Sequence, residues 1–238
     1  MSHYVLVHGA WEESQAWEKV VPSLEAKGHQ VSAIDLPGHG KNLVAISDMT
    51  MQNYIKTVTE RIEEINKPVI LVAHSMSGAV VSQVAEIIPE RIERLVYVCA
   101  FLLEEGATVM EAMSSDDGQF LPNLIFAEDM SYASVPEATL RSAGFHDVDE
   151  DVIEHFLPTF IEKQSTEPFM AKVAVSQDRF GKIPKTYIRT SIDRVTTPAL
   201  QDRMIKNWNV ENVLHLEAGH FPSFSVPEKL ADLLLTTA

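Results

Sequence analysis

The chain has 238 residues, of which 45% are hydrophobic and 22% are charged, and its formal net charge at pH 7 is -15. This composition predicts a folded domain with a large core and excludes an intrinsically disordered chain. The excess of acidic residues argues against nucleic acid and against anionic membrane surfaces as partners, because both require a basic patch.

Cysteine usage and the first residues of the chain give expectations about the compartment. The single cysteine, Cys99, cannot form an internal disulfide, and its apolar neighbours predict a buried core residue. The first residues, MSHYVLVHGAW, are already typical of a strand and lack the basic and apolar regions of a signal peptide. No apolar run reaches the roughly 18 residues of a transmembrane helix. We therefore expect a cytoplasmic protein.

Short apolar runs alternate with helical patterns through the first hundred residues. Strands are predicted at 3–8, from 30 onward, at 68–74 and at 92–101. Helices are predicted at 16–29, 51–65 and 77–89, and Gly28 is a suitable end for the first of them. This β-α-β succession predicts an α/β fold, with a mostly parallel central sheet and helices on both of its faces.

The alternation stops between residues 102 and 181. This stretch is acidic, rich in aromatic residues and patterned as several short helices, so we expect an inserted, mainly helical cap, or lid. The earlier theme returns with strands at 185–191 and 212–218 and helices at 197–208 and 225–238. The core is therefore predicted to comprise residues 1–101 and 182–238, and the cap residues 102–181.

The segment VILVAHSMSGAVV, residues 69–81, joins a predicted strand to a predicted helix through two serines. A nucleophilic serine on such a tight turn needs small residues two positions before and after it. Ser75, flanked by Ala73 and Ser77, meets this condition, and so does Ser77, flanked by Ser75 and Ala79. Ser75 is favoured because the strand runs directly into it and a good helix begins after it. The alternative is that Ser75 only caps the helix.

A catalytic serine also needs a base, and a base needs a group that orients it. Among nine histidines, His220 stands out because it lies on a loop after the last predicted strand. Asp193 follows the strand at 185–191, which gives the chain order Ser, Asp, His. The alternative acids are Asp202, which falls inside the next predicted helix, and Glu104 and Glu105, which follow the strand at 92–101.

The end of the first strand, VLVHGAW, supplies the remaining parts of the expected site. We predict that the main-chain N–H groups of Ala10 and of Met76, the residue after Ser75, form an oxyanion hole. The residues expected to contact substrate are Gly9, Trp11, His74, Phe101 and Phe221.

These motifs together resemble an α/β-hydrolase, in the branch of plant methylesterases, hydroxynitrile lyases and bacterial pyrethroid-hydrolase-like esterases. The usual GHSMGG-like motif of that branch aligns with His74, Ser75 and Met76, and places Ala73 and Ser77 at two glycines. Other matching segments are YVLVHGAW, IERLVYVCAFL, YIRTSIDRVTTPALQDRMI and LEAGHFP. The resemblance implies a Ser75–His220–Asp193 triad that uses no metal and no cofactor.

The chain departs from that branch at informative positions. Glu12 and Glu13 stand where the branch often has a His-Gly pair. Hydroxynitrile lyases have threonine at the position of Gly9 and lysine at that of Phe221, which argues against a lyase. We expect a serine hydrolase that cleaves a small, apolar carboxylic ester through an acyl-enzyme, as a monomer or homodimer. The alternatives are a lyase-like enzyme or cofactor-free dioxygenase on the same fold, or a hydrolase-like binding protein for small molecules.

Overall fold

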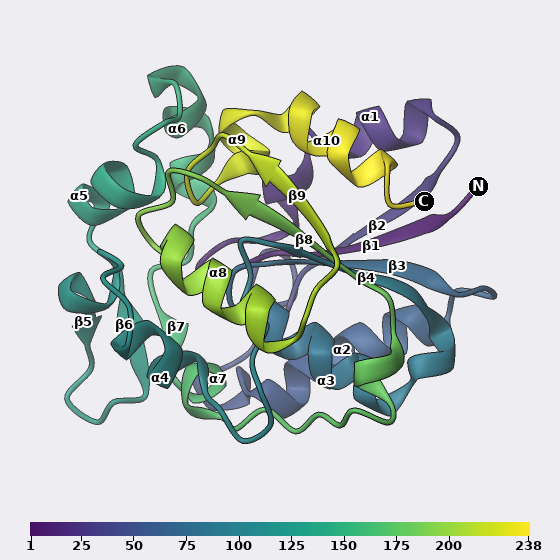
Figure 1. Ribbon diagram of the computed structural model, residues 1–238. Helices are drawn as coiled ribbons and strands as arrows, with labels where there is room; N and C mark the ends of the chain where they lie inside the picture. Colours follow the sequence, from purple (N-terminus) through teal and green to yellow (C-terminus); the bar gives the residue numbers. More distant parts are fainter.

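Six parallel strands form the central sheet of the computed structural model, which describes all residues from 1 to 238 (Figure 1). Their order across the sheet is β2-β1-β3-β4-β8-β9. The strands are β1 (His3–Val7), β2 (Gln30–Ile34), β3 (Val69–His74), β4 (Ile92–Val98), β8 (Lys185–Thr190) and β9 (Asn212–Leu216). The predicted α/β class with a parallel sheet is confirmed.

Alternate side chains of the strands enter two separate cores, as the two-residue period of a strand requires. Val5 and Leu71 belong to the larger core of 50 buried residues, under α2 (Met51–Glu63), α3 (Ser77–Ile87) and α8 (Pro198–Asn207). Tyr4 and Ile70 belong to a core of 16 residues, under α1 (Val21–Ala26) and α10 (Pro227–Leu235). Helices therefore bury both faces of the sheet (Figure 1).

The first helix is shorter than predicted, and a proline explains where it begins. The predicted range 16–29 splits into a 3-10 turn, Ser14–Trp17, and the helix α1, which starts at Val21 with Pro22 in its first turn. Proline fits the first turn because the N–H that it lacks has no partner there. The helix ends at Ala26, and Gly28, the predicted stop, follows the capping residue Lys27 with a φ of 84°.

Most of residues 102–170 lie at the carboxyl ends of the central strands, and the chain then runs back along α3 to the start of β8 (Figure 1). They form α4 (Val109–Ser114), α5 (Glu137–Thr139), α6 (Glu150–Phe156) and α7 (Glu167–Met170). They also form a small antiparallel sheet of β5 (Ile125–Phe126), β6 (Tyr132–Ser134) and β7 (Gln164–Ser165), which the sequence patterns did not predict. The division into core and cap stays a prediction.

Short turns and one further helix complete the chain. The helix α9 (Pro222–Ser225) directly follows the loop that carries His220. The 3-10 turns beyond Ser14–Trp17 are Ile46–Asp48, Pro89–Arg91, Leu121–Asn123, Leu157–Thr159 and Phe180–Lys182, and Leu140–Gly144 is a π turn. No helix combines the length and the apolar character needed to cross a membrane.

Candidate active site

Ser75 occupies a strained turn between β3 and α3. Its φ is 51°, a left-handed conformation that is uncommon for residues other than glycine and that clusters at functional sites. The first turn of α3 also packs tightly on the segment after β4, since a Cβ on Gly78 would lie 2.6 Å from the carbonyl oxygen of Phe101. The segment therefore has the geometry expected of a nucleophile elbow.

The two serines of the turn have different partners. The hydroxyl of Ser75 lies 2.9 Å from Nε2 of His220. Ser77 is fully buried, and its Oγ lies 3.0 Å from the carbonyl oxygen of Val7 and 2.8 Å from that of His74. The same oxygen accepts the N–H of His74 at 3.1 Å. The structure thus brings Ser75 to the histidine, whereas Ser77 connects the ends of β1 and β3.

His220 is held by the carboxylate of Asp193, which follows β8. Its Nδ1 lies 2.9 Å from Asp193 Oδ2, and the other carboxylate oxygen accepts the N–H groups of Val195 at 2.7 Å and Thr196 at 3.0 Å. Because an ionised carboxylate only accepts hydrogen bonds, Nδ1 carries the proton of the neutral ring. Nε2 is then free to accept the proton of Ser75.

The three alternative acids lie outside this arrangement. Asp202 forms an ion pair with Arg189 near the surface. Glu104 and Glu105 accept hydrogen bonds from groups that belong to other parts of the fold. None of the three bonds to His220, so Asp193 is the acid that the geometry favours.

Some main-chain N–H groups near Ser75 donate hydrogen bonds within the protein, and others do not. Those of Gly9 and Trp11 donate to side-chain oxygens at 2.6 and 3.2 Å. The N–H groups of Ala10 and Met76 have no hydrogen-bond partner within the protein. Both are therefore available to an oxyanion formed at Ser75, in agreement with the prediction, although their role stays a prediction.

A small apolar cavity lies beside Ser75 and His220, with a volume of about 20 Å³. Its apolar lining includes three expected residues, Trp11, Phe101 and Phe221. It also includes three residues of the stretch 102–181 that the sequence did not single out, namely Met113, Phe120 and Phe169.

Two residues that were expected to contact substrate, Gly9 and His74, do not line the cavity. His74 instead turns toward Glu12, a residue noted in the sequence only as a departure.

Glu12 and His74 form a buried pair beneath the site. Nδ1 of His74 lies 2.6 Å from Oε2 of Glu12. Burial opposes the charge on each group, yet the ion pair and its hydrogen bond outweigh burial, lowering the pKa of Glu12 and raising the pKa of His74. Each group therefore favours the charged form of the other.

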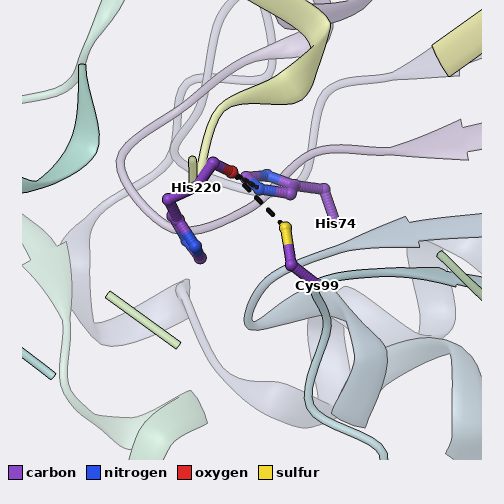
Figure 2. A group of neighbouring side chains, drawn as sticks. All are labelled: His74, Cys99 and His220. Atoms are coloured by element: carbon purple, nitrogen blue, oxygen red, sulfur yellow. Dashed lines mark hydrogen bonds between the residues drawn. The ribbon is translucent and has the colours of Figure 1, made fainter. Parts of the chain in front are cut away.

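The side chains of His74, Cys99 and His220 offer atoms within 4.8 Å of one another, which raises the question of a metal site (Figure 2). His74 Nε2 and Cys99 Sγ each donate a hydrogen bond to the carbonyl oxygen of His220, at 2.7 and 3.4 Å. The ring nitrogens of His220 are already bound by Ser75 and Asp193. The donor set therefore suits hydrogen bonding, and not a metal ion.

This fold, with a strained serine, a histidine and a buried aspartate at the carboxyl ends of parallel strands, defines a class of protein. Residues 4–233 match the alpha/beta hydrolase family, and the chain belongs to this family.

Individual relatives place the chain in the branch that its motifs resemble. Methylesterase 7 of Arabidopsis thaliana is 31% identical over 258 residues, covering 99% of this chain and 95% of the relative. An alpha-hydroxynitrile lyase of the same plant is 27% identical, covering 99% and 96%. The chain spans 64% of the length of a further Arabidopsis relative, a chloroplastic one with a methylesterase name and 30% identity.

A solved structure supports the same placement. The crystal structure of a pyrethroid hydrolase from Sphingobium faniae superposes with a TM-score of 0.86 and 28% sequence identity, covering 99% of this chain and 96% of the hydrolase.

Proposed function

We propose that the protein is a carboxylic ester hydrolase that forms an acyl-enzyme on Ser75. The observation that carries this proposal is the unbroken set of hydrogen bonds from Ser75 through His220 to Asp193, with spacings of 2.9 Å at both steps. These are the distances at which a base can take a proton from a nucleophile.

In the proposed mechanism, His220 removes the hydroxyl proton of Ser75 through Nε2 while Ser75 attacks the ester carbonyl. The N–H groups of Ala10 and Met76 donate to the oxygen on which negative charge develops. Asp193 stabilises the imidazolium that forms. The protonated His220 then gives its proton to the leaving alcohol, and a water molecule, activated by the same ring, releases the acid and regenerates Ser75.

The cavity supports a small, apolar substrate. Eight of its 11 lining residues are hydrophobic, and the one charged residue among them, Glu12, is paired with His74. A volume of about 20 Å³ is close to the space of one water molecule, so side chains such as Phe120 and Phe169 must move when an ester enters. The names of the relatives, a methylesterase and a pyrethroid hydrolase, also favour an ester as substrate.

A lyase is the alternative raised by the relatives, since one of them carries the name alpha-hydroxynitrile lyase. Splitting a cyanohydrin needs groups that move the hydroxyl proton and stabilise cyanide. At the two positions where the sequence comparison expects such groups, this chain has Gly9 and Phe221, which offer no hydroxyl and no ammonium group. We therefore favour the hydrolase.

The test combines a serine-reactive fluorophosphonate probe with kinetics on short and long p-nitrophenyl esters, a methyl ester and a cyanohydrin. We expect the probe to label the peptide that contains Ser75. Ser75→Ala should abolish both labelling and ester turnover. Ser77→Ala should still be labelled and should keep much of its ester turnover, because Ser77 contacts neither His220 nor the cavity.

Three outcomes contradict the proposal. An inactive Ser77→Ala variant together with an active Ser75→Ala variant moves the nucleophile to the other serine. Cyanohydrin cleavage without ester turnover identifies a lyase. Tight binding of esters without an acyl-enzyme burst identifies a binding protein.

A further inference from the structure

Glu12 is an ionised carboxylate in the floor of the site, with no role in the triad. It follows β1 and is 1% exposed. Its Oε2 accepts two hydrogen bonds, from the N–H of Gly9 at 2.6 Å and from Nδ1 of His74 at 2.6 Å. One carboxylate oxygen therefore connects the turn that precedes Ala10 with the last residue of β3.

The partners of His74 determine its protonation state. Nδ1 meets the carboxylate of Glu12, and Nε2 meets the carbonyl oxygen of His220 at 2.7 Å. A carbonyl oxygen only accepts hydrogen bonds, and the Glu12 carboxyl group, whose pKa is lowered by His74, only accepts them when it is ionised. With Glu12 ionised, both ring nitrogens of His74 donate. His74 is therefore an imidazolium ion, in agreement with its raised pKa, and Glu12 supplies the opposite charge.

The hydrogen bonds that start at Glu12 lead through His74 to the main chain of His220. Its carbonyl oxygen accepts hydrogen bonds from His74 at the end of β3 and from the thiol of Cys99, which directly follows β4 (Figure 2). The loop after β9 is thus tied to two neighbouring strands, within a few ångströms of the ring that meets Ser75.

We propose that Glu12 and His74 are positioning residues for the reaction. Glu12 holds the Gly9 turn so that the N–H of Ala10 points to the oxyanion, and it keeps His74 doubly protonated. His74 in turn fixes the main chain of His220. The kinetic part of this inference rests on the proposed ester hydrolysis, whereas the charge on His74 does not.

Glu12→Gln is the informative substitution, because it preserves shape and removes charge. The amide that this substitution introduces can take two orientations. With its oxygen at the position of Oε2, it accepts hydrogen bonds from the N–H of Gly9 and from Nδ1 of His74, but the neutral His74 ring then has no proton on Nε2 and loses its bond to the carbonyl oxygen of His220. With its nitrogen at that position, two donors face each other, because the amide NH₂ group meets the N–H of Gly9. Every neutral arrangement therefore loses a hydrogen bond.

The experiment has a spectroscopic and a kinetic measurement. In two-bond ¹H–¹⁵N spectra at pH 7, His74 should give the pattern of a doubly protonated ring in the unmodified protein and a neutral tautomer in Glu12→Gln. In Glu12→Gln, kcat should fall about 10- to 100-fold, which is the fold-change that corresponds to one lost hydrogen bond to a charged group. KM should change by less than about threefold. The matched control is Glu13→Gln, one residue along, where both properties should stay unchanged.

The two measurements separate the possible failures. A neutral His74 ring in the unmodified protein overturns the inference, whether or not any variant folds. A cationic ring with an unchanged kcat in Glu12→Gln shows that the pair does not position the site. Absence of ester turnover in the unmodified protein contradicts the proposed function instead.

The Cys99 variants test the same arrangement if Glu12→Gln does not fold. Cys99→Ala should lower kcat, and Cys99→Ser should restore it. No loss in Cys99→Ala would contradict the proposed role of the His220 carbonyl.

Discussion

Replacing Asp193 by asparagine should change the tautomer of His220, the proposed base, while leaving the fold in place. Asp193 Oδ1 accepts the main-chain N–H groups of Val195 and Thr196 at 2.7 and 3.0 Å. In the variant only the amide oxygen can accept them, so the NH₂ group must take the place of Oδ2, 2.9 Å from Nδ1 of His220. Nδ1 then has to accept a hydrogen bond, and the ring proton moves to Nε2.

A proton on Nε2 removes the base, because this nitrogen faces the hydroxyl of Ser75 at 2.9 Å. In serine hydrolases with this arrangement, the wrong tautomer lowers kcat by about 10⁴-fold. We expect the same order of loss in Asp193→Asn, with little change in KM because Asp193 does not line the cavity. Stopped-flow kinetics on p-nitrophenyl acetate would measure acylation directly, and circular dichroism would verify the fold.

The control for this prediction is Asp202→Asn, which makes the same chemical change in the neighbouring helix. Asp202 pairs with Arg189 near the surface, and breaking such a pair costs at most about 1 kcal/mol of stability. Its activity should therefore stay within about twofold of the unmodified protein. A folded Asp193→Asn variant that keeps a tenth of the activity, or an inactive Asp202→Asn variant, would refute the assignment of the acid.

Two further predictions concern the cavity and the elbow. Phe120→Ala should enlarge the cavity beside Ser75 and raise kcat/KM for hexanoate relative to acetate p-nitrophenyl esters; an unchanged ratio would show that Phe120 does not limit the acyl group. Gly78→Ala should lower the free energy of unfolding by about 1–3 kcal/mol, since its Cβ would lie 2.6 Å from the Phe101 carbonyl oxygen. Urea denaturation checks this value, and a variant as stable as the unmodified protein would contradict the tight packing.

The parallel sheet and the proximity of Ser75, His220 and Asp193 could be predicted because their causes are local or follow from topology. Strands buried on both faces produce apolar runs such as residues 69–74, and parallel strands place their carboxyl ends at one edge of the sheet. A serine, an aspartate and a histidine that each follow such a strand must therefore lie near one another. The structure places Ser75, Asp193 and His220 within hydrogen-bond distance for this reason.

The parts that sequence reasoning missed depend on contacts between distant segments. The strands β5, β6 and β7 have two or three residues each, which is too short for a periodic pattern. Phe120 and Phe169 were two of many aromatic residues in one stretch, and nothing local shows which of them reach the cavity. Glu12 is visible in the sequence only as a departure from the branch pattern, and its distance to His74 reveals a buried ion pair.

Two departures from the branch motif, Glu12 and Ser77, both contact His74 although 65 positions separate them in the numbering. The Ser77 hydroxyl contacts the carbonyl oxygen of Val7 at the end of β1 and both main-chain polar groups of His74. The Glu12 carboxylate bonds to Gly9, just beyond the same strand, and to the His74 ring. Both residues therefore fasten the end of β1 to His74, one through main chain and one through charge. Because β1 leads to Ala10 and His74 precedes Ser75, the two departures stabilise the spacing between the oxyanion site and the nucleophile. A hydroxyl at position 77 is thus part of the frame that holds Ser75, which explains why a buried serine fits a position where glycine is usual.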